Sequence, residues 1–170
     1  MKNIAIAMVV VASLFLFSCE KNSTQQGCQY TPSKIVAPMS EQIALQDSLT
    51  AHSIVAIKDT AGFFYTINQP GSVSGVNDLC TSVAVYYTGG FFNGHVFDST
   101  TIGQPAVFQL VQVIVGWQKG IPLIKKGGDI TLYIPPSLGY GNIPKLDNAG
   151  DTVIPANSNL IFHVNLLDVQ

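Results

Sequence analysis

Short stretches in which apolar and polar residues alternate fill most of the chain beyond residue 62, and most of them end at Gly or Pro. The clearest are residues 130–134, which stop at Pro135-Pro136, and residues 160–166. A period of two residues places every second side chain on the same face of a β-strand. The pattern predicts several short strands, each with one buried face and joined by turns. The other expected strands cover residues 63–68, 83–87, 96–99 and 107–111.

Two segments depart from this alternation and predict helices. Residues 114–124 contain Trp117 and indicate a short helix in which Pro122 must fall near an end, because proline breaks a helix interior. Residues 40–50 predict an N-terminal helix with Ser40 as its N-cap and an acid in the first turn. Many strands with one short central helix predict an α+β domain built on an antiparallel sheet. The apolar stripe of the N-terminal helix consists of Ile43, Leu45 and Leu49.

The first segment has the pattern of an export signal. Lys2 supplies a positive start, and residues 4–17 are predominantly apolar and carry no charge. This length is too short for a bilayer, which needs about 20 residues, but it fits a secretory signal. The residues up to Cys19 resemble a bacterial lipobox, although Phe17 is bulkier than is usual there. We expect a lipoprotein signal peptide over residues 1–18 and a lipid on Cys19, with an ordinary signal cleaved elsewhere as the alternative.

A lipid on Cys19 would make residues 19–38 a polar linker between the membrane and the folded part of the chain. The protein would then be exported and anchored in the bacterial cell envelope, either facing the periplasm or in the outer membrane. Export places the chain in an oxidising compartment. We therefore expect Cys28 and Cys80 to form a disulfide, with two free thiols as the alternative.

The charge pattern excludes several classes of function. The formal net charge is −2 and there is no basic run, so nucleic acid is not an expected partner. There is no Cys-x-x-Cys motif, and the three histidines lack ligand spacing, so we expect no metal site. The sequence also contains no convincing catalytic triad and no phosphate-binding loop. We expect no cofactor.

Six segments in the same order, covering about two thirds of the chain, resemble the FKBP-type peptidyl-prolyl cis-trans isomerases. The resemblance implies a twisted antiparallel β-sheet wrapped around one short α-helix over residues 61–170. The helix predicted from the pattern of residues 40–50 makes residues 39–60 an N-terminal helical extension of this domain. The segments are residues 85–89 (VYYTG), 93–99 (NGHVFDS), 108–110 (FQL), 113–117 (VIVGW), 134–141 (IPPSLGYG) and 154–162 (IPANSNLIF).

The resemblance also implies the site. Trp117 matches the floor of the family's pocket, and Asp98 and Tyr140 match two polar side chains at its rim. The backbone N–H of Ile114 and the hydroxyl of Tyr140 match donors to substrate carbonyl groups. The implied catalytic residues are Asp98, Tyr140, Trp117 and Tyr87, and the implied substrate-binding residues are Phe97, Val113, Ile114, Phe162 and Ile154. Without the resemblance, aromatic residues on strands would be assigned to the core.

Some positions depart from the family pattern. We expect Phe108 to lie in the core, and Ala106 stands where many members place a pocket Phe. The missing ring would remove part of one wall and weaken binding of the family's macrolide inhibitors. The loop over residues 142–152 is long and is expected to shape which peptides enter. Gln118 and Lys119 replace common acids and are expected to face solvent.

The resemblance implies a peptidyl-prolyl cis-trans isomerase that acts on proline-containing polypeptides and assists the folding of exported proteins. The reaction needs no nucleophile, metal or cofactor, because only the amide bond rotates. One alternative is a non-catalytic FKBP-like chaperone or peptide-binding module of the cell envelope. Another is a structural envelope lipoprotein whose domain only docks to a partner. Turnover of a proline peptide would separate the first reading from both alternatives.

Overall fold

The computed structural model describes residues 27–170. The predicted signal peptide over residues 1–18 and the predicted lipidation site at Cys19 lie outside the described residues. Among residues 27–170, no helix combines the length and the apolar character needed to cross a membrane.

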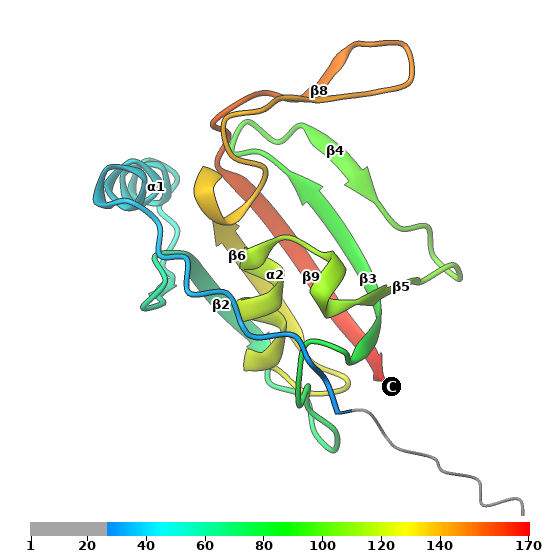
Figure 1. The fold of residues 1–170 in the computed structure, drawn as a ribbon. Coiled ribbons are helices and arrows are strands. Elements are labelled where there is room, and N and C mark those ends of the chain that lie inside the picture. The colour runs from blue at the N-terminus through cyan, green and yellow to red at the C-terminus, as the bar shows by residue number, and fades with distance from the viewer. Residues whose placement is uncertain (1–26) are drawn as a thin grey trace, which may run out of the picture.

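A seven-stranded antiparallel sheet forms the body of the molecule, as Figure 1 shows. The strand order is β1-β2-β6-β9-β3-β4, and β5 pairs with β3 beside β4. Alternate residues of β9 are buried, which is the period of two that the sequence predicts. The strands are β1 (Ile57–Lys58), β2 (Phe64–Gln69), β3 (Ser82–Gly90), β4 (Val96–Ser99), β5 (Ala106–Gln109), β6 (Asp129–Ile134) and β9 (Leu160–Val169).

One short helix, α2 (Val115–Gly120), lies in the concave side of this sheet and continues into the 3-10 helix η2 (Ile121–Leu123). A Cβ atom at Gly116 would lie 2.6 Å from the Ile134 side chain, and one at Gly120 would lie 2.5 Å from Leu132. Because glycine has no side chain, α2 can lie directly on β6. The main core fills the space between α2 and the sheet. This architecture confirms the predicted α+β class, with the sheet wrapped around one short helix.

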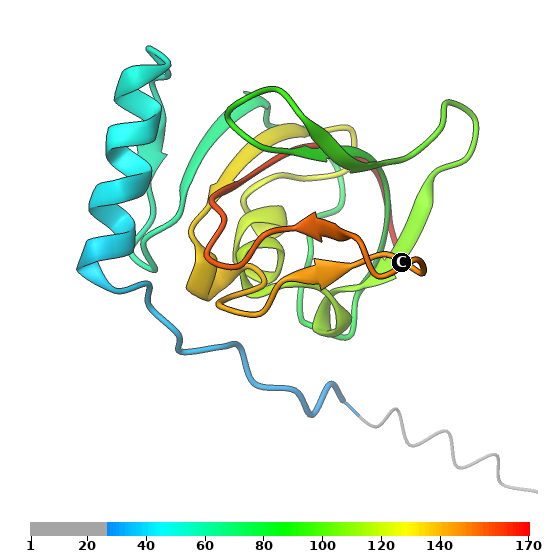
Figure 2. The same cartoon turned by 90° about the horizontal axis from the view of Figure 1, so that it is seen from above.

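The N-terminal helix α1 (Met39–Ala51) covers part of the opposite face of the sheet. Leu45 and Leu49 on α1 are buried against Phe64 of β2 and Tyr133 of β6. Tyr133 follows Leu132, whose side chain points toward α2, and successive strand residues point to opposite faces. The two helices therefore lie on different sides of β6, and Figure 2 shows α1 beside the barrel-like curve of the sheet.

The start of α1 differs from the prediction. Pro38, not Ser40, is the N-cap, and no side chain caps the helix. Ile43 is 54% exposed, while Gln42 is buried and donates its amide N–H to the Ala37 carbonyl oxygen over 2.6 Å. Leu45 and Leu49 are four residues apart and therefore share one face of the helix. Ile43 is two residues from Leu45, so its side chain points to a different side of the helix.

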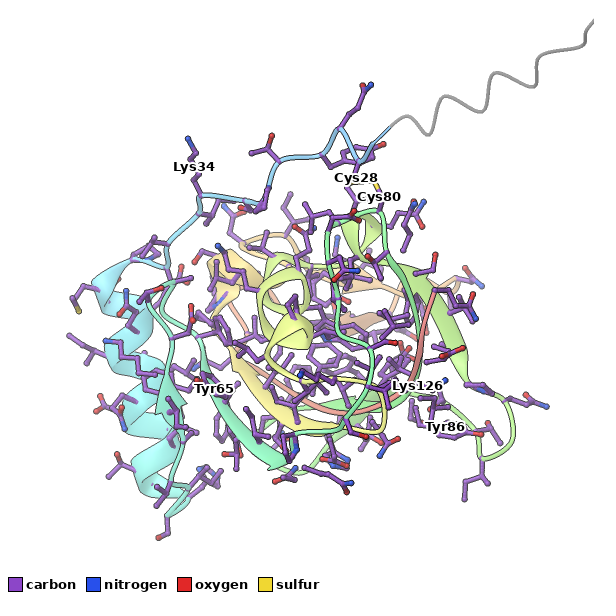
Figure 3. All side chains as sticks on the ribbon, turned by 90° about the horizontal axis from the view of Figure 1, so that it is seen from below. Cys28, Lys34, Tyr65, Cys80, Tyr86 and Lys126 are labelled. Carbon is purple, nitrogen blue, oxygen red and sulfur yellow. A yellow bond between two sulfur atoms is a disulfide. The ribbon has the colours of Figure 1, made fainter. Side chains whose placement is uncertain are left out.

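The described part of the predicted linker lies against the domain. Ala37 is buried and its N–H donates to the Ala61 carbonyl oxygen over 2.8 Å. In the structure Cys28 and Cys80 form a disulfide across 52 residues of chain, and Figure 3 shows the two residues together where this arm meets the domain. Residues 28–37 are therefore held to the domain at both ends.

The predicted long loop over residues 142–152 contains secondary structure. β7 (Lys145–Leu146) pairs with β8 (Thr152–Ile154) in a small antiparallel hairpin. The hairpin extends from one end of the main sheet, at the top of Figure 1. The remaining short elements are the 3-10 helices η1 (Leu110–Gln112) and η3 (Pro136–Leu138).

Candidate active site

Trp117 forms the centre of an aromatic cluster between α2 and the sheet. Its side chain is 3% exposed. The rings of Tyr87, Phe108 and Phe162 meet it edge to face, with centroids 5.3, 5.7 and 5.3 Å away and interplanar angles of 86–87°. Edge-to-face contacts are a favoured geometry for aromatic rings. Three strands thus fix the orientation of one indole from different sides, because these partners lie on β3, β5 and β9.

A cavity of about 220 Å³ opens above this cluster. Small-molecule sites commonly measure about 300–1,000 Å³, so this cavity suits one small ring better than a large ligand. Most of its surface is aromatic or aliphatic, with a few polar groups at the rim. The lining residues are Tyr87, Asp98, Phe108, Gln112, Val113, Ile114, Trp117, Tyr140 and Phe162.

Tyr87 and Asp98 form one polar edge of the cavity. The Tyr87 hydroxyl donates to Asp98 Oδ2 over 2.5 Å. Burial raises the pKa of Tyr87, and the hydrogen bond to Asp98 and the charge of that carboxylate raise it further. Tyr87 therefore stays neutral and keeps the exposed carboxylate of Asp98 in one place.

Tyr140 stands at the rim in the segment that follows η3. Its side chain is half-buried, and burial followed by the charge of Asp98 raises the pKa of its hydroxyl. Among residues 27–170 this hydroxyl has no hydrogen-bond partner, while Lys145 Nζ lies 5.3 Å from the ring centroid. The neutral hydroxyl is thus available to donate to a ligand in the cavity.

A second free donor comes from the start of α2. Ile114 is the N-cap of this helix, and its own N–H donates to no acceptor in the described part of the chain. The preceding wall segment is held by Gln118, whose side-chain amide donates to the Val113 carbonyl oxygen over 2.8 Å. The prediction that Gln118 and Lys119 face solvent was wrong. Both are partly buried, and Lys119 Nζ donates to the Ser33 carbonyl oxygen over 2.7 Å.

Seven of the nine residues predicted for the site line this cavity, namely Tyr87, Asp98, Val113, Ile114, Trp117, Tyr140 and Phe162. Phe97 and Ile154 do not line it. The Phe97 ring packs behind Phe162, with centroids 5.6 Å apart, and Ile154 is buried in the core.

Two lining residues were not predicted. Phe108 was assigned to the core, yet its partly buried ring forms a wall of the cavity. Ala106 lies two residues earlier on β5 and is outside the lining, so the side chain at position 106 contributes nothing to the cavity wall. Gln112 at the end of η1 also lines the cavity. The period of two along β5 puts positions 106 and 108 on one face and could have suggested Phe108.

The lining contains no Cys, His, Ser or Thr side chain that could act as a nucleophile. It offers instead an aromatic floor, aliphatic walls and neutral donors at the rim. This arrangement defines a class of proteins that bind a small apolar ring of a peptide and hold the polar groups next to it.

Comparison with known families agrees with this class. Residues 78–167, more than half of the chain, match the FKBP-type peptidyl-prolyl cis-trans isomerase family. The chain belongs to this family, as the six sequence segments suggested. The match includes every residue that lines the cavity.

Curated relatives are similar over the same part of the chain. A probable FKBP-type peptidyl-prolyl cis-trans isomerase of Haemophilus influenzae is 46% identical over 111 residues, which cover 65% of this chain and 44% of the relative. The FKBP-type peptidyl-prolyl cis-trans isomerase FkpA of Escherichia coli is 43% identical over 112 residues, covering 65% of this chain and 39% of the relative. The chain thus matches less than half the length of these relatives.

Solved structures share the fold. The crystal structure of FkpA from Escherichia coli has a TM-score of 0.65 and 35% identity, covering 77% of this chain and 60% of that chain. A peptidyl-prolyl cis-trans isomerase from Pseudomonas syringae has a TM-score of 0.64 and 26% identity, covering 79% of this chain and 97% of that one.

Proposed function

We propose that this chain is a peptidyl-prolyl cis-trans isomerase that rotates X-Pro bonds in the cavity above Trp117. One observation carries the proposal. Three aromatic rings contact the indole of Trp117 edge to face, and this cluster forms the floor of a cavity of about 220 Å³. A proline ring matches this space in size and in apolar character. The family membership supports the same activity.

The physics of the reaction fits such a cavity. Rotation of an amide bond costs about 18–20 kcal/mol, because the twisted state loses resonance. The twisted amide is also less dipolar than the planar amide. A dry aromatic cavity therefore disfavours the planar state relative to the twisted state, and this difference lowers the barrier. No covalent bond to the protein forms in this process.

The two free donors at the rim would select the twisted geometry. The N–H of Ile114 and the hydroxyl of Tyr140 come from different elements, so together they can hold two carbonyl groups of a bound peptide. When both carbonyl groups are held, the peptide bond between them is the part that rotates. Binding is then tighter in the twisted state than in either planar isomer. Asp98 adds a negative charge at the same edge, kept in place by Tyr87.

We further propose that the protein acts at the bacterial cell envelope on exported polypeptides. The signal-like residues 1–18 and the lipobox-like sequence at Cys19 support export and a lipid anchor. The disulfide between Cys28 and Cys80 supports an oxidising compartment. The non-catalytic alternative draws on Ala106 and on the long loop over residues 142–152, and the turnover experiment separates it from the isomerase.

The proposal is tested by isomerase turnover of a proline-containing peptide with the wild-type chain and with Tyr140→Phe. A lost neutral hydrogen bond is worth about 1 kcal/mol, so we expect kcat/KM to fall about fivefold in the variant. Tyr65→Phe, on β2 and outside the cavity lining, is the matched control and should keep wild-type turnover. A folded wild-type chain without turnover would contradict the proposal and favour a peptide-binding module.

A further inference from the structure

The position of Tyr140 depends on the turn that precedes it. The N–H groups of Gly139 and Gly141, on either side of Tyr140, both donate to the Pro136 carbonyl oxygen over 2.9 and 2.8 Å. Pro136 is the first residue of η3. A displacement of η3 would therefore move Tyr140 and its hydroxyl.

A side chain from the N-terminal helix holds η3. The backbone N–H of Ser137, in the middle of η3, donates to Glu41 Oε2 over 2.9 Å. The two residues are 96 positions apart in the sequence. Both are partly buried, and hydrogen bonds from backbone N–H groups to a carboxylate are shorter and stronger than those between neutral groups. Glu41 thus joins α1 to the segment that carries a rim residue of the cavity.

The carboxylate of Glu41 is well positioned for this contact because of its place on α1. Glu41, Leu45 and Leu49 are four residues apart, so they share one face of the helix. Leu45 and Leu49 are at most 1% exposed and hold this face on the sheet. β6 ends at Ile134, two residues before η3, so the end of α1 that bears Glu41 lies at the end of β6 from which η3 emerges.

We propose that Glu41 is a positioning residue for the isomerase reaction: through Ser137 it fixes η3, and through η3 it aims the Tyr140 hydroxyl into the cavity. The N-terminal helix then contributes to turnover without touching the substrate. This inference rests on the proposed isomerase function and names an element that supports it. It also assigns a role to a helix outside the residues that match the family.

The test measures kcat and KM of the full chain for a proline-containing peptide. It compares the wild type with three variants at position 41 and one control variant at position 47. In Glu41→Ala and Glu41→Asp the contact is lost, the second because its side chain is one carbon shorter, and we expect kcat to fall about fivefold with a smaller change in KM. Glu41→Gln keeps an acceptor oxygen and should stay within about twofold of wild type. Asp47→Ala, an exposed change on the same helix, is the matched control.

A double-mutant cycle with Tyr140→Phe separates positioning from a general structural effect. If Glu41 acts through the Tyr140 hydroxyl, Glu41→Asp has little further effect on kcat in the Tyr140→Phe background. Fully additive losses, or a Glu41→Asp variant with wild-type kcat, would overturn the inference. Thermal unfolding of each variant verifies that the measured chains are folded.

Failure of the inference about Glu41 can be distinguished from failure of the proposed isomerase function. A wild-type chain without turnover refutes the isomerase proposal itself. The inference about Glu41 is then decided by peptide affinity, followed through the fluorescence of Trp117, the single tryptophan of the chain. Weaker binding in Glu41→Asp that vanishes in the Tyr140→Phe background supports positioning, and equal affinity overturns it.

Discussion

At the scale of single residues, the pair of Tyr87 and Asp98 shows how the polar edge of the cavity is kept in order. The Tyr87 ring belongs to the aromatic cluster, and its hydroxyl belongs to the rim. One side chain therefore couples the packing of the floor to the placement of a carboxylate.

This pair gives a prediction on pH. At neutral pH, Tyr87→Phe should lower the free energy of unfolding by about 1 kcal/mol, because a hydrogen bond is lost. The pKa of Tyr87 is raised in the folded state, so above its ordinary value of about 10 the unfolded chain loses the phenolic proton first. Wild-type stability then falls as pH rises, and the gap to the variant narrows. Urea unfolding at about pH 8 and about pH 10.5 measures the gap, and a constant gap would refute the assignment.

Prediction from the family resemblance placed Trp117 and Tyr140 in the site, and both line the cavity, whereas residue type alone would have assigned Trp117 to the core. It failed where the outcome depends on which side of a strand faces the cavity. Phe108 and Phe97 are both aromatic strand residues, and the sequence alone does not fix how β4 and β5 are inclined against α2. Gln118 illustrates a related difficulty, because its partner is a backbone carbonyl, which leaves no pattern in the sequence.

At the scale of elements, the arm over residues 28–37 is tied to the domain by covalent and non-covalent contacts. The disulfide lies at one end, the Lys119–Ser33 hydrogen bond in the middle, and buried Ala37 at the other end. The arm passes by α2, so it covers a part of the molecule that a free linker would leave open to solvent.

Removal of the disulfide should destabilise the folded chain. A cross-link that closes a loop of this length lowers the entropy of the unfolded chain, so its loss should reduce the free energy of unfolding by about 3–4 kcal/mol. Denaturant unfolding with and without reductant, beside the double variant Cys28→Ser and Cys80→Ser, measures the loss. The double variant should not respond to reductant. Equal stability of both oxidised and reduced wild type would contradict the expectation.

The order and type of the elements could be predicted because alternation and helix periodicity are local properties. The start of α1 could not be placed, because Ser40 is by residue type a better N-cap than Pro38, and only the course of the arm decides the position. Likewise, the pairing of β7 with β8 depends on a turn in a polar stretch without apolar alternation. Local patterns do not reveal such pairing.

At the scale of the whole molecule, the sheet is covered on both faces near β6, by α2 and by α1. The two cores share β6 through Leu132 and Tyr133, which are neighbours in sequence. We therefore expect the described chain to unfold as one unit, with α1 included.

This expectation can be measured with Leu45→Ala. Deletion of a fully buried leucine side chain costs about 2–5 kcal/mol, so the midpoint of unfolding should fall for every probe alike. Ile43→Ala, on the exposed side of α1, is the matched control and should change the free energy of unfolding by less than about 0.5 kcal/mol. A lower midpoint for the helix signal alone, with Trp117 fluorescence unchanged, would show that α1 unfolds separately.

The central place of β9 has a consequence for how the chain is made. β9 pairs with β6 on one side and β3 on the other, yet its residues are translated after all of its partners. Until β9 has left the ribosome, the sheet lacks its middle strand, and the main core, which includes Leu160, Phe162 and Leu166, cannot close. The nascent chain thus folds only after this whole region has been synthesised.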